Sequence, residues 1–292
     1  MDRLAAMSTF IRVVETGSFS AAARHLRVGQ PAVSKAIAQL EERLGVRLLS
    51  RTTRGLSPTD AGLGFYEGAK RAVDEADEAE NAARGASAAL TGLLRIGTSV
   101  TFGRLHVVPR LKSFLDAHPK LDVEVAMDDR NVDLVEEGVD VMLRLGESFA
   151  PAHIGRKIAT CRRLVVAAPS YLAREGEPIA PDELSRHEAI LFVRAGISNR
   201  WTFRRGAEEV SLAGQGRLRV TSAEGIREAV LAGIGFTVGS EWMFDAELRS
   251  GAVRPVLVDW ALPPVELWAL FPAGRKASAR ARTFVDFLAG SL

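Results

Sequence analysis

The stretch from Gly17 to Gly45, GSFSAAARHLRVGQPAVSKAIAQLEERLG, restricts the possible folds of this chain more than any other part of it. It holds two alanine-rich, helix-favouring runs, separated by a short break with one glycine and one proline. In the second run the apolar residues are spaced four, three and four apart, and they are Val33, Ile37, Leu40 and Leu44. This spacing predicts a helix over residues 30–44 that buries a single apolar stripe.

Two further helices are predicted before this one. The segment LAAMSTFIRVV has apolar residues three to four apart, which predicts a first helix with one buried face formed by Leu4, Met7, Ile11 and Val14. Ser18 is a suitable N-cap for a second, short helix, and the alanines that follow it allow close approach of another helix. Gly45 is expected to end the third helix.

The side of the third helix that faces away from the apolar stripe is small and polar. It carries Lys35 and Ala38, with Ser34 on its flank and Gln30 at the helix start. Gln and Ser can hydrogen-bond to base edges, and Lys can reach guanine or phosphate. The pattern fits a helix-turn-helix whose second helix enters the major groove of DNA, although the apolar spacing alone also fits any helical hairpin.

The next segment, VRLLSRTTRGLSPTDAG, predicts a β hairpin with arginines at its tip. Arg51 and Arg54 bracket two threonines, and Gly55 follows. A winged helix-turn-helix uses such a hairpin against phosphates or the minor groove, whereas for one arginine alone a solvated turn is the preferred explanation. Residues 1–60 contain nine Lys or Arg against five Asp or Glu, so basic charge is concentrated where a polyanion would bind.

The run from FIRVVETGSFSAAARHL through QPAVSKAIAQLEERLGVRLLSRTTRGLSPTDAG resembles the N-terminal domain of LysR-type transcriptional regulators. Carried over by position, the resemblance implies two groups of DNA-binding residues. Gln30, Pro31, Ser34 and Lys35 would face the major groove, and Arg51 and Arg54 would belong to the wing. Gly29 departs from the family, which more often has a capping serine there; glycine is an acceptable N-cap, but one possible side-chain contact to DNA is lost.

A long helix is predicted after the hairpin, because no proline occurs between Pro58 and Pro109 and Thr59 is a plausible N-cap. Its heptad seam is alanine except at the two ends: Phe65, Ala69, Ala72, Ala76, Ala79, Ala83, Ala86 and Leu90. A stripe of small residues lets two helix axes come close, which predicts self-association. The resemblance implies a homodimer through this linker helix, with a homotetramer expected, and recognition helices placed on the half-sites of an inverted-repeat promoter in double-stranded DNA.

From Leu93 onward, short apolar strands alternate with helical stretches, which predicts an α/β domain with largely parallel sheets. The last strand, VELWALF, follows a block from Leu164 to Pro264 that looks self-contained. A chain that leaves one lobe, builds a second and returns would form two lobes. The resemblance implies this return, because these regulators carry an effector domain built like a periplasmic solute-binding protein.

The expected architecture is therefore an α+β multidomain chain with three parts. They are a winged helix-turn-helix domain over 1–58, a linker and dimerisation helix over 59–91, and a two-lobed α/β effector-binding domain over 92–292 that resembles periplasmic binding proteins. Lobe 1 is expected to comprise 92–163 and 265–292, and lobe 2 to comprise 164–264.

Ligands of open α/β sheets bind at the carboxyl ends of strands and near helix N-termini, which favour anions. The candidate effector-binding residues at such places are Ser99, Thr101, Phe102, Arg144, Leu145 and Thr221. The resemblance implies effector binding at the serine, the two threonines and the leucine of this set. At any single position an ordinary helix cap is the more common role of such a hydroxyl, and the set gains weight only together. Arg144 and Arg104 could supply positive charge for a carboxylate, although arginines at such places are more often structural or surface residues. A small organic anion is the expected effector.

An enzyme and an architectural DNA-binding protein are the alternative classes. The five histidines lack metal-ligand spacing, and neither a Gly-x-Ser-x-Gly elbow nor a P-loop occurs, so no catalytic residue, metal or cofactor is expected. The large C-terminal half argues against a purely architectural factor. The favoured function is a sequence-specific transcriptional regulator controlled by its effector, and not an enzyme.

No apolar run reaches the roughly 18 residues of a membrane span, and the charged N-terminus argues against a signal peptide, so a cytoplasmic protein without membrane contact is expected. Cys161 is the only cysteine and is expected to be a small buried hydrophobe. A redox role stays open, because Arg162 and Arg163 could lower the pKa of its thiol.

Overall fold

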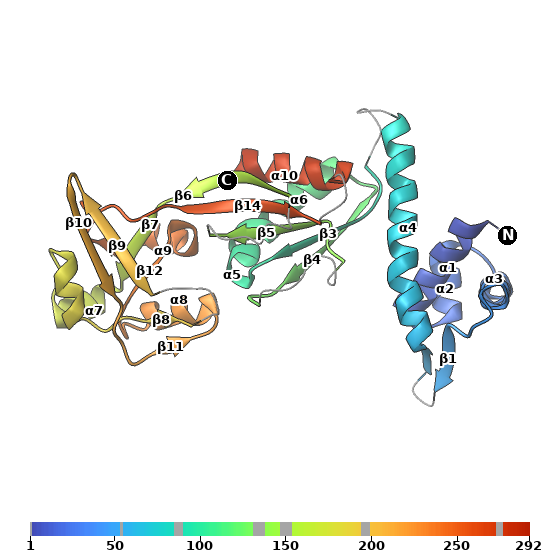
Figure 1. The fold of residues 1–292 in the computed structure, drawn as a ribbon, viewed down its shortest axis with the longest axis horizontal. Helices are drawn as coiled ribbons and strands as arrows, with labels where there is room; N and C mark the ends of the chain where they lie inside the picture. The colour runs from blue at the N-terminus through green and yellow to red at the C-terminus, as the bar shows by residue number, and fades with distance from the viewer. Residues whose placement is uncertain are drawn as a thin grey trace. The chain divides into compact units, whose positions relative to one another are not determined.

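The computed structural model describes residues 2–52, 55–84, 90–130, 138–146, 154–193, 199–272 and 277–292. The chain divides into two compact units, Met1–Gly92 and Leu93–Leu292 (Figure 1). Within the described ranges, no helix is both long and apolar enough to cross a membrane.

The first unit begins with the three predicted helices, α1 (Arg3–Thr16), α2 (Phe19–Leu26) and α3 (Gln30–Leu44). Ser18 caps α2 as predicted, because its hydroxyl accepts a hydrogen bond from the backbone N–H of Ala21 at 3.3 Å. Gly45 ends α3 in the left-handed region with φ 70°, also as predicted. At the other end of α3, Gly29 supplies no capping side chain.

The core of this unit confirms most of the predicted α3 stripe and corrects the face of α1. Val33, Ile37 and Leu40 are buried, but Leu44, the last helical residue, is 38% exposed and lies outside the core. In α1 the predicted face is only partly buried or exposed, and the buried residues are Ala6, Phe10 and Val13. In α1 the predicted and the observed buried faces are offset by one residue, which is about 100° around the helix. The large ring of Phe10 occupies the interior.

The predicted hairpin is confirmed. Strands β1 (Leu49–Thr52) and β2 (Gly55–Pro58) pair antiparallel. Glu41 of α3 fixes the start of this hairpin, because its Oε1 accepts hydrogen bonds from the backbone N–H groups of Leu48 at 2.7 Å and Leu49 at 3.0 Å. One carboxylate thus connects α3 to the start of the hairpin.

The long helix α4 (Asp60–Arg84) follows, capped by Thr59 as predicted, since the hydroxyl accepts from Gly62 N at 3.0 Å. The first part of the predicted seam packs inside its own unit: Ala69 is 1% exposed, and Phe65 meets the edge of Phe10 at a ring distance of 5.4 Å. These two positions are therefore used within the subunit rather than by a partner helix. Further along, Ala72 and Ala76 are half-buried and Ala79 is exposed. The side chains of Ala83 and Ala86 lie outside the described residues.

The second unit contains a first lobe built on a five-stranded sheet in the order β4-β3-β5-β14-β6. Its strands are β3 (Gly92–Thr98), β4 (Leu121–Met127), β5 (Val141–Leu145), β6 (Ile154–Cys161) and β14 (Val265–Phe271). Strand β14 comes from the C-terminal end of the chain and lies between β5 and β6, which confirms the return of the chain to this lobe (Figure 1).

Helices cover this sheet, and some of these segments also contact the second lobe. They are α5 (Val100–Phe102), the π-helical segment η1 (Gly103–Val107), α6 (Val108–Ala117) and α10 (Ala279–Ser291). Phe114 of α6 meets Phe284 of α10 at a ring distance of 5.4 Å, so the two long helices pack on each other.

The second lobe is built around the sheet β12-β7-β13, formed by β7 (Arg163–Ala167), β12 (Phe236–Ser240) and β13 (Arg254–Val256). The other strands are β8 (Leu191–Phe192), β9 (Arg200–Arg205), β10 (Glu208–Ala213) and β11 (Arg219–Val220). The helices are α7 (Pro169–Glu175), η2 (Pro181–Arg186), α8 (Ala223–Leu231), η3 (Glu241–Met243) and α9 (Asp245–Ser250). Val165 and Val166 of β7 belong to different apolar clusters, so both faces of the sheet are covered.

The expectation of largely parallel sheets is wrong. Strands β3 and β5 pair parallel, as do β8 and β11, but β14 is antiparallel to both of its neighbours and β7 is antiparallel to β12 and β13. The error has a simple cause. Apolar periodicity indicates which face of a strand is buried and contains no information about its direction.

Candidate functional site

The exposed face of α3 carries the first group of candidate residues. Gln30, Pro31, Ser34 and Lys35 are all exposed, while the buried stripe of the same helix faces the core. The structure therefore brings these four predicted residues together on the outward side of the first turns of α3. Their amide, hydroxyl and ammonium groups can donate or accept hydrogen bonds in a nucleic-acid groove.

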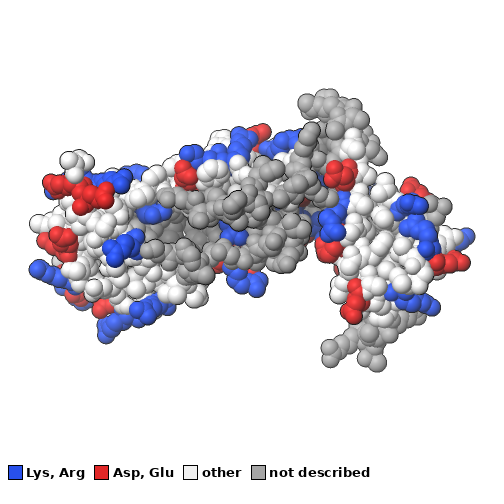
Figure 2. Space-filling view, in the orientation of Figure 1, with Lys and Arg blue, Asp and Glu red and all other residues white. Residues whose placement is uncertain are grey.

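Basic side chains that the sequence interpretation did not single out surround this helix. Arg24 and Arg27 at the end of α2, and Arg43 and Arg47 at the end of α3, are exposed. Figure 2 shows Lys and Arg side chains at several places on the visible face of the first unit. Such charges favour a polyanion irrespective of its sequence.

Arg27 also determines the turn between α2 and α3. It is a non-glycine residue with φ 54°, and its backbone N–H bonds to Arg24 O at 3.2 Å while Val28 N bonds to Ala23 O at 3.0 Å. The left-handed conformation costs a residue with a side chain about 1–2 kcal/mol. The sequence indicated that α2 ends near this point, but it did not indicate that Arg27 adopts the left-handed conformation, because arginine has no sequence pattern that marks a positive φ.

The wing residues are described only in part. Arg51 lies in β1 and pairs with Leu56 in β2, but its side chain and the whole of Arg54 lie outside the described residues. The wing contacts therefore stay predictions.

The candidate effector-binding residues of lobe 1 lie at one end of the parallel pair β3–β5, where Thr98 is opposite Leu143. Ser99 precedes α5, and Arg144 and Leu145 are the last residues of β5; all three are half-buried. Thr221 is exposed and stands shortly before α8 in lobe 2.

Thr101 and Phe102 are buried, at 5% and 3% exposure. Within the described part of the chain, the Thr101 hydroxyl is buried without a hydrogen-bond partner, and so is that of Thr98, which the sequence interpretation missed. A buried hydroxyl without a partner is unfavourable, so these two groups mark a place where a polar ligand would be stabilising.

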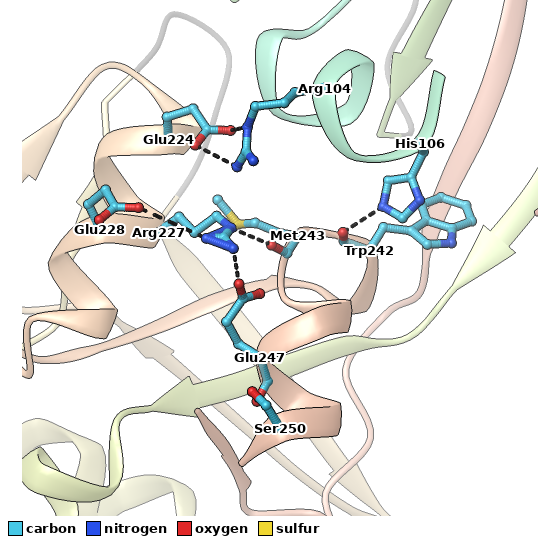
Figure 3. Close-up of polar contacts among 9 residues, drawn as sticks. All are labelled: Arg104, His106, Glu224, Arg227, Glu228, Trp242, Met243, Glu247 and Ser250. Atoms are coloured by element: carbon cyan, nitrogen blue, oxygen red, sulfur yellow. Dashed lines mark hydrogen bonds and ion pairs between the residues drawn. The ribbon is translucent and has the colours of Figure 1, made fainter. Parts of the chain in front are cut away.

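A bidentate ion pair joins the two lobes (Figure 3). Arg104 of η1 donates from Nε to Oε1 of Glu224 in α8 at 3.1 Å, and from Nη2 to Oε2 at 2.9 Å. Arg104 was considered as a partner for an effector carboxylate. In the structure its guanidinium already holds a carboxylate of the chain itself.

A second contact between the lobes joins the buried side chain of His106 to half-buried Trp242. His106 Nε2 lies 2.7 Å from the backbone oxygen of Trp242 in η3, and because a carbonyl only accepts, Nε2 carries the proton. Burial is the main cause that lowers the pKa of His106, which favours the neutral ring. Phe102 stacks on His106 at 5.0 Å and meets Trp242 edge-on at 5.6 Å, so this candidate effector residue serves as packing between the lobes.

Arg227 of α8 supports the segment that carries Trp242. Its Nε donates to the backbone oxygen of Met243 at 3.2 Å, and its Nη2 donates to the carboxylate of Glu247 in α9 (Figure 3). The Arg227 side chain is 7% exposed and Glu228 approaches it at 4.0 Å from the same helix. These contacts connect α8, η3 and α9 within lobe 2.

Cys161 is half-buried, and burial is the main cause that raises the pKa of its thiol to about 11. Arg163 acts in the opposite direction as a minor influence, and Arg162 is paired with Glu241. The lowering expected from a neighbouring arginine is thus present for Arg163, but burial outweighs it and the thiol pKa is raised. The thiol stays protonated near neutral pH, which disfavours redox reactivity.

Two family models match the chain and together cover most of it. Residues 4–63 match the bacterial regulatory helix-turn-helix protein of the lysR family, and residues 87–292 match the LysR substrate binding domain. An HTH-type transcriptional regulator of Xanthomonas campestris is 34% identical over 283 residues, covering 96% of this chain and 82% of that protein. The HTH-type transcriptional activator TtdR of Escherichia coli is 31% identical over 291 residues, covering 97% and 91%.

Solved structures give the same result. CrgA, a LysR-type transcriptional regulator from Neisseria meningitidis, has a TM-score of 0.64 at 30% identity and covers 98% of each chain. A full-length AphB variant has a TM-score of 0.61 at 26% identity and covers 99% of this chain and 98% of that one. Both similarities extend over the helix-turn-helix unit and the two-lobed unit.

Proposed function

Because the chain belongs to the LysR family of bacterial transcriptional regulators, and not to a family of enzymes, we propose that it reads duplex DNA with α3 and the wing and responds to an effector bound between its lobes. The LysR family combines a DNA-binding domain with an effector-binding domain, and its members form oligomers. The observation that carries the DNA part is the exposure of Gln30, Pro31, Ser34 and Lys35 opposite the buried stripe.

In this proposal each exposed residue of α3 has a separate task. Gln30 and Ser34 hydrogen-bond to base edges, and Lys35 reaches guanine or a phosphate. Pro31 is small enough to allow close approach to the groove. Arg51 and Arg54 contact the backbone or the minor groove from the wing, as in other winged helices.

We propose a small organic anion as the effector class. The support is a set of polar groups at strand ends and helix starts of the two lobes: the hydroxyls of Ser99, Thr101 and Thr221, together with Arg144 and the backbone end of β5 at Leu145. The unpaired buried hydroxyl of Thr101 is the strongest single argument, because a ligand would satisfy it. Phe102 contributes indirectly through its packing on His106 and Trp242.

We further propose a homodimer through α4, and a homotetramer of two such dimers. The support is the series Ala72, Ala76 and Ala79 of the seam, of which the first two are half-buried and the third is exposed. A two-fold axis would place two copies of α3 on the half-sites of an inverted repeat. Because its target is the chromosome, a cytoplasmic location is part of the proposal.

The test is selection of binding sites from random duplex DNA by the full-length protein. The wild type should enrich an inverted repeat, and binding should weaken steeply with salt. Lys35→Ala should lose part of its sequence preference as well as affinity. The control, Arg43→Ala, removes the same charge from the exposed far end of α3 and should weaken binding to all sequences alike.

Two outcomes of this selection would count against the proposal. Enrichment of no sequence by the wild type would favour an architectural protein that binds DNA without reading it. Equal effects of Lys35→Ala and Arg43→Ala would remove the N-terminal end of α3 from the reading surface.

A further inference from the structure

The ion pair between Arg104 and Glu224 has the geometry of a reversible connection. Two parallel hydrogen bonds of 3.1 and 2.9 Å join a guanidinium of lobe 1 to a carboxylate of lobe 2. The two side chains are 49% and 27% exposed, so water can replace either partner. An ion pair that water reaches is weak and can open and close readily.

The neighbouring contact of His106 with Trp242 has the opposite character. His106 is 5% exposed, and its side chain donates to the backbone oxygen of Trp242 (Figure 3). The ring of Phe102 packs against both His106 and Trp242. Opening it would expose aromatic surface and leave a carbonyl without its donor, which is costly. The two lobes are therefore joined by one contact that is costly to break, His106 with Trp242, and by one that opens easily, Arg104 with Glu224.

Both contacts start from the same short segment, η1. This segment is π-helical, a form that is rare and frequent at functional sites. Gly103 is required at its start, because a Cβ there would lie 2.7 Å from both Met127 Sδ and Thr98 Cγ2. Thr101, with its unpaired hydroxyl, precedes η1 directly through α5. A shift of the backbone at Thr101 would therefore be passed directly to Arg104, which lies three residues further along the same helical segment.

We propose that the Arg104–Glu224 pair is a latch between the two lobes. While the pair is closed, α8 is held against η1. When it opens, α8 is released and the lobes turn about the buried contact of His106 with Trp242. A ligand that binds one arrangement more tightly shifts the population toward it. The latch itself is independent of the function proposed above, whereas its regulatory consequence rests on that function.

The test measures the distance between the lobes in the full-length protein by double electron–electron resonance. Spin labels are attached at Lys112→Cys in lobe 1 and Arg217→Cys in lobe 2, which are 83% and 92% exposed, in a Cys161→Ser background. Glu224→Gln should raise a second distance population clearly above its level in the unsubstituted protein. Glu228→Gln is the control on the same helix, because Glu228 is 73% exposed and its ion pair among the described residues is with Arg227 of its own lobe.

A charge exchange separates the latch from a general loss of structure. Arg104→Glu and Glu224→Arg should each raise the second population, and the double variant should return it to the level of the unsubstituted protein. An unchanged distance in Glu224→Gln would overturn the latch, and so would a double variant that keeps native tryptophan fluorescence but fails to restore the distance.

DNA binding by the same variants is measured separately. A changed lobe distance with unchanged DNA binding would overturn the regulatory consequence and leave the latch in place. Absence of sequence-specific binding by the wild type would overturn the proposed function, and the distance measurements would still decide about the latch.

Discussion

Removal of the Glu41 carboxylate should loosen the wing from the recognition helix. Glu41 is 12% exposed, and its Oε1 accepts from the backbone N–H groups of Leu48 and Leu49, which are themselves 1% and 9% exposed. Hydrogen bonds to charged groups contribute about 1.5–3 kcal/mol each, and water can reach only part of this site. Glu41→Ala should therefore destabilise the first unit by about 2–4 kcal/mol, and Glu41→Gln, which keeps an acceptor oxygen, by about 1 kcal/mol.

The distribution of tryptophan makes this measurable in the intact protein. All four tryptophans, Trp201, Trp242, Trp260 and Trp268, belong to the second unit. Tryptophan fluorescence therefore follows only that unit, whereas helical circular dichroism follows both. Glu41→Ala should bring an early circular-dichroism transition in denaturant with an unchanged fluorescence midpoint, and the Leu48 and Leu49 amides should exchange faster with deuterium.

The control is Glu42→Ala, an exposed carboxylate on the same helix, which should leave both transitions in place. The reasoning about Glu41 is refuted if Glu41→Ala and Glu42→Ala unfold alike. It is also refuted if Glu41→Gln is as damaging as Glu41→Ala, because the loss would then not come from the acceptor oxygen.

Four other predictions follow from burial and charge. Leu40→Ala should cost about 3–4 kcal/mol because Leu40 is fully buried, whereas Leu44→Ala, at 38% exposure, should cost less than about 1 kcal/mol; denaturant midpoints test both. Thr101→Val should keep or slightly raise the melting temperature, since it removes an unpaired buried hydroxyl. It should also abolish the rise in melting temperature that active compounds from a panel of small organic acids give the wild type, and an unchanged rise would remove Thr101 from the site. Alkylation of Cys161 by iodoacetamide should be slow at neutral pH and rise about tenfold per pH unit, because its thiol pKa is raised to about 11; rapid reaction near neutrality would contradict this. Burial lowers the folded-state pKa of His106, so the unfolded chain takes up the proton first and stability falls as pH drops below about 6.5; His106→Gln should flatten this slope in denaturant titrations.

Local features of the fold were predictable from sequence because their signals are local. The helix α3 was recognisable from Pro31, Gly45 and the apolar spacing, and the outward position of Ser34 and Lys35 followed from the stripe on the other side. Caps such as Ser18 act within a few residues of the chain, so the sequence contains them directly.

Patterns that admit more than one partner were less informative. In α1 the apolar residues form two stripes, and only packing shows that Phe10 is the interior residue. The seam of α4 predicted a helix partner, but the pattern does not specify which helix, and α1 of the same unit covers Phe65 and Ala69. Strand direction is likewise absent from periodicity.

Contacts between distant residues could not be predicted at all. Arg104 and Glu224 are 120 positions apart, and His106 and Trp242 are 136 apart. Nothing in a single sequence pairs one arginine among many with one glutamate. The lobe junction therefore emerged only from the fold, although Thr101 was a candidate beforehand.

The central claim is that the N-terminal, polar face of α3 enters a groove of DNA, and photo-crosslinking tests it most directly. The photoreactive residue p-benzoylphenylalanine replaces Ser34 in one variant and Leu44, exposed at the far end of the same helix, in another, and each is irradiated on duplexes selected by the full-length protein. We predict crosslinks to bases from position 34 and none from position 44. Crosslinks from position 44 alone, or from neither while the protein stays bound, would contradict the claim.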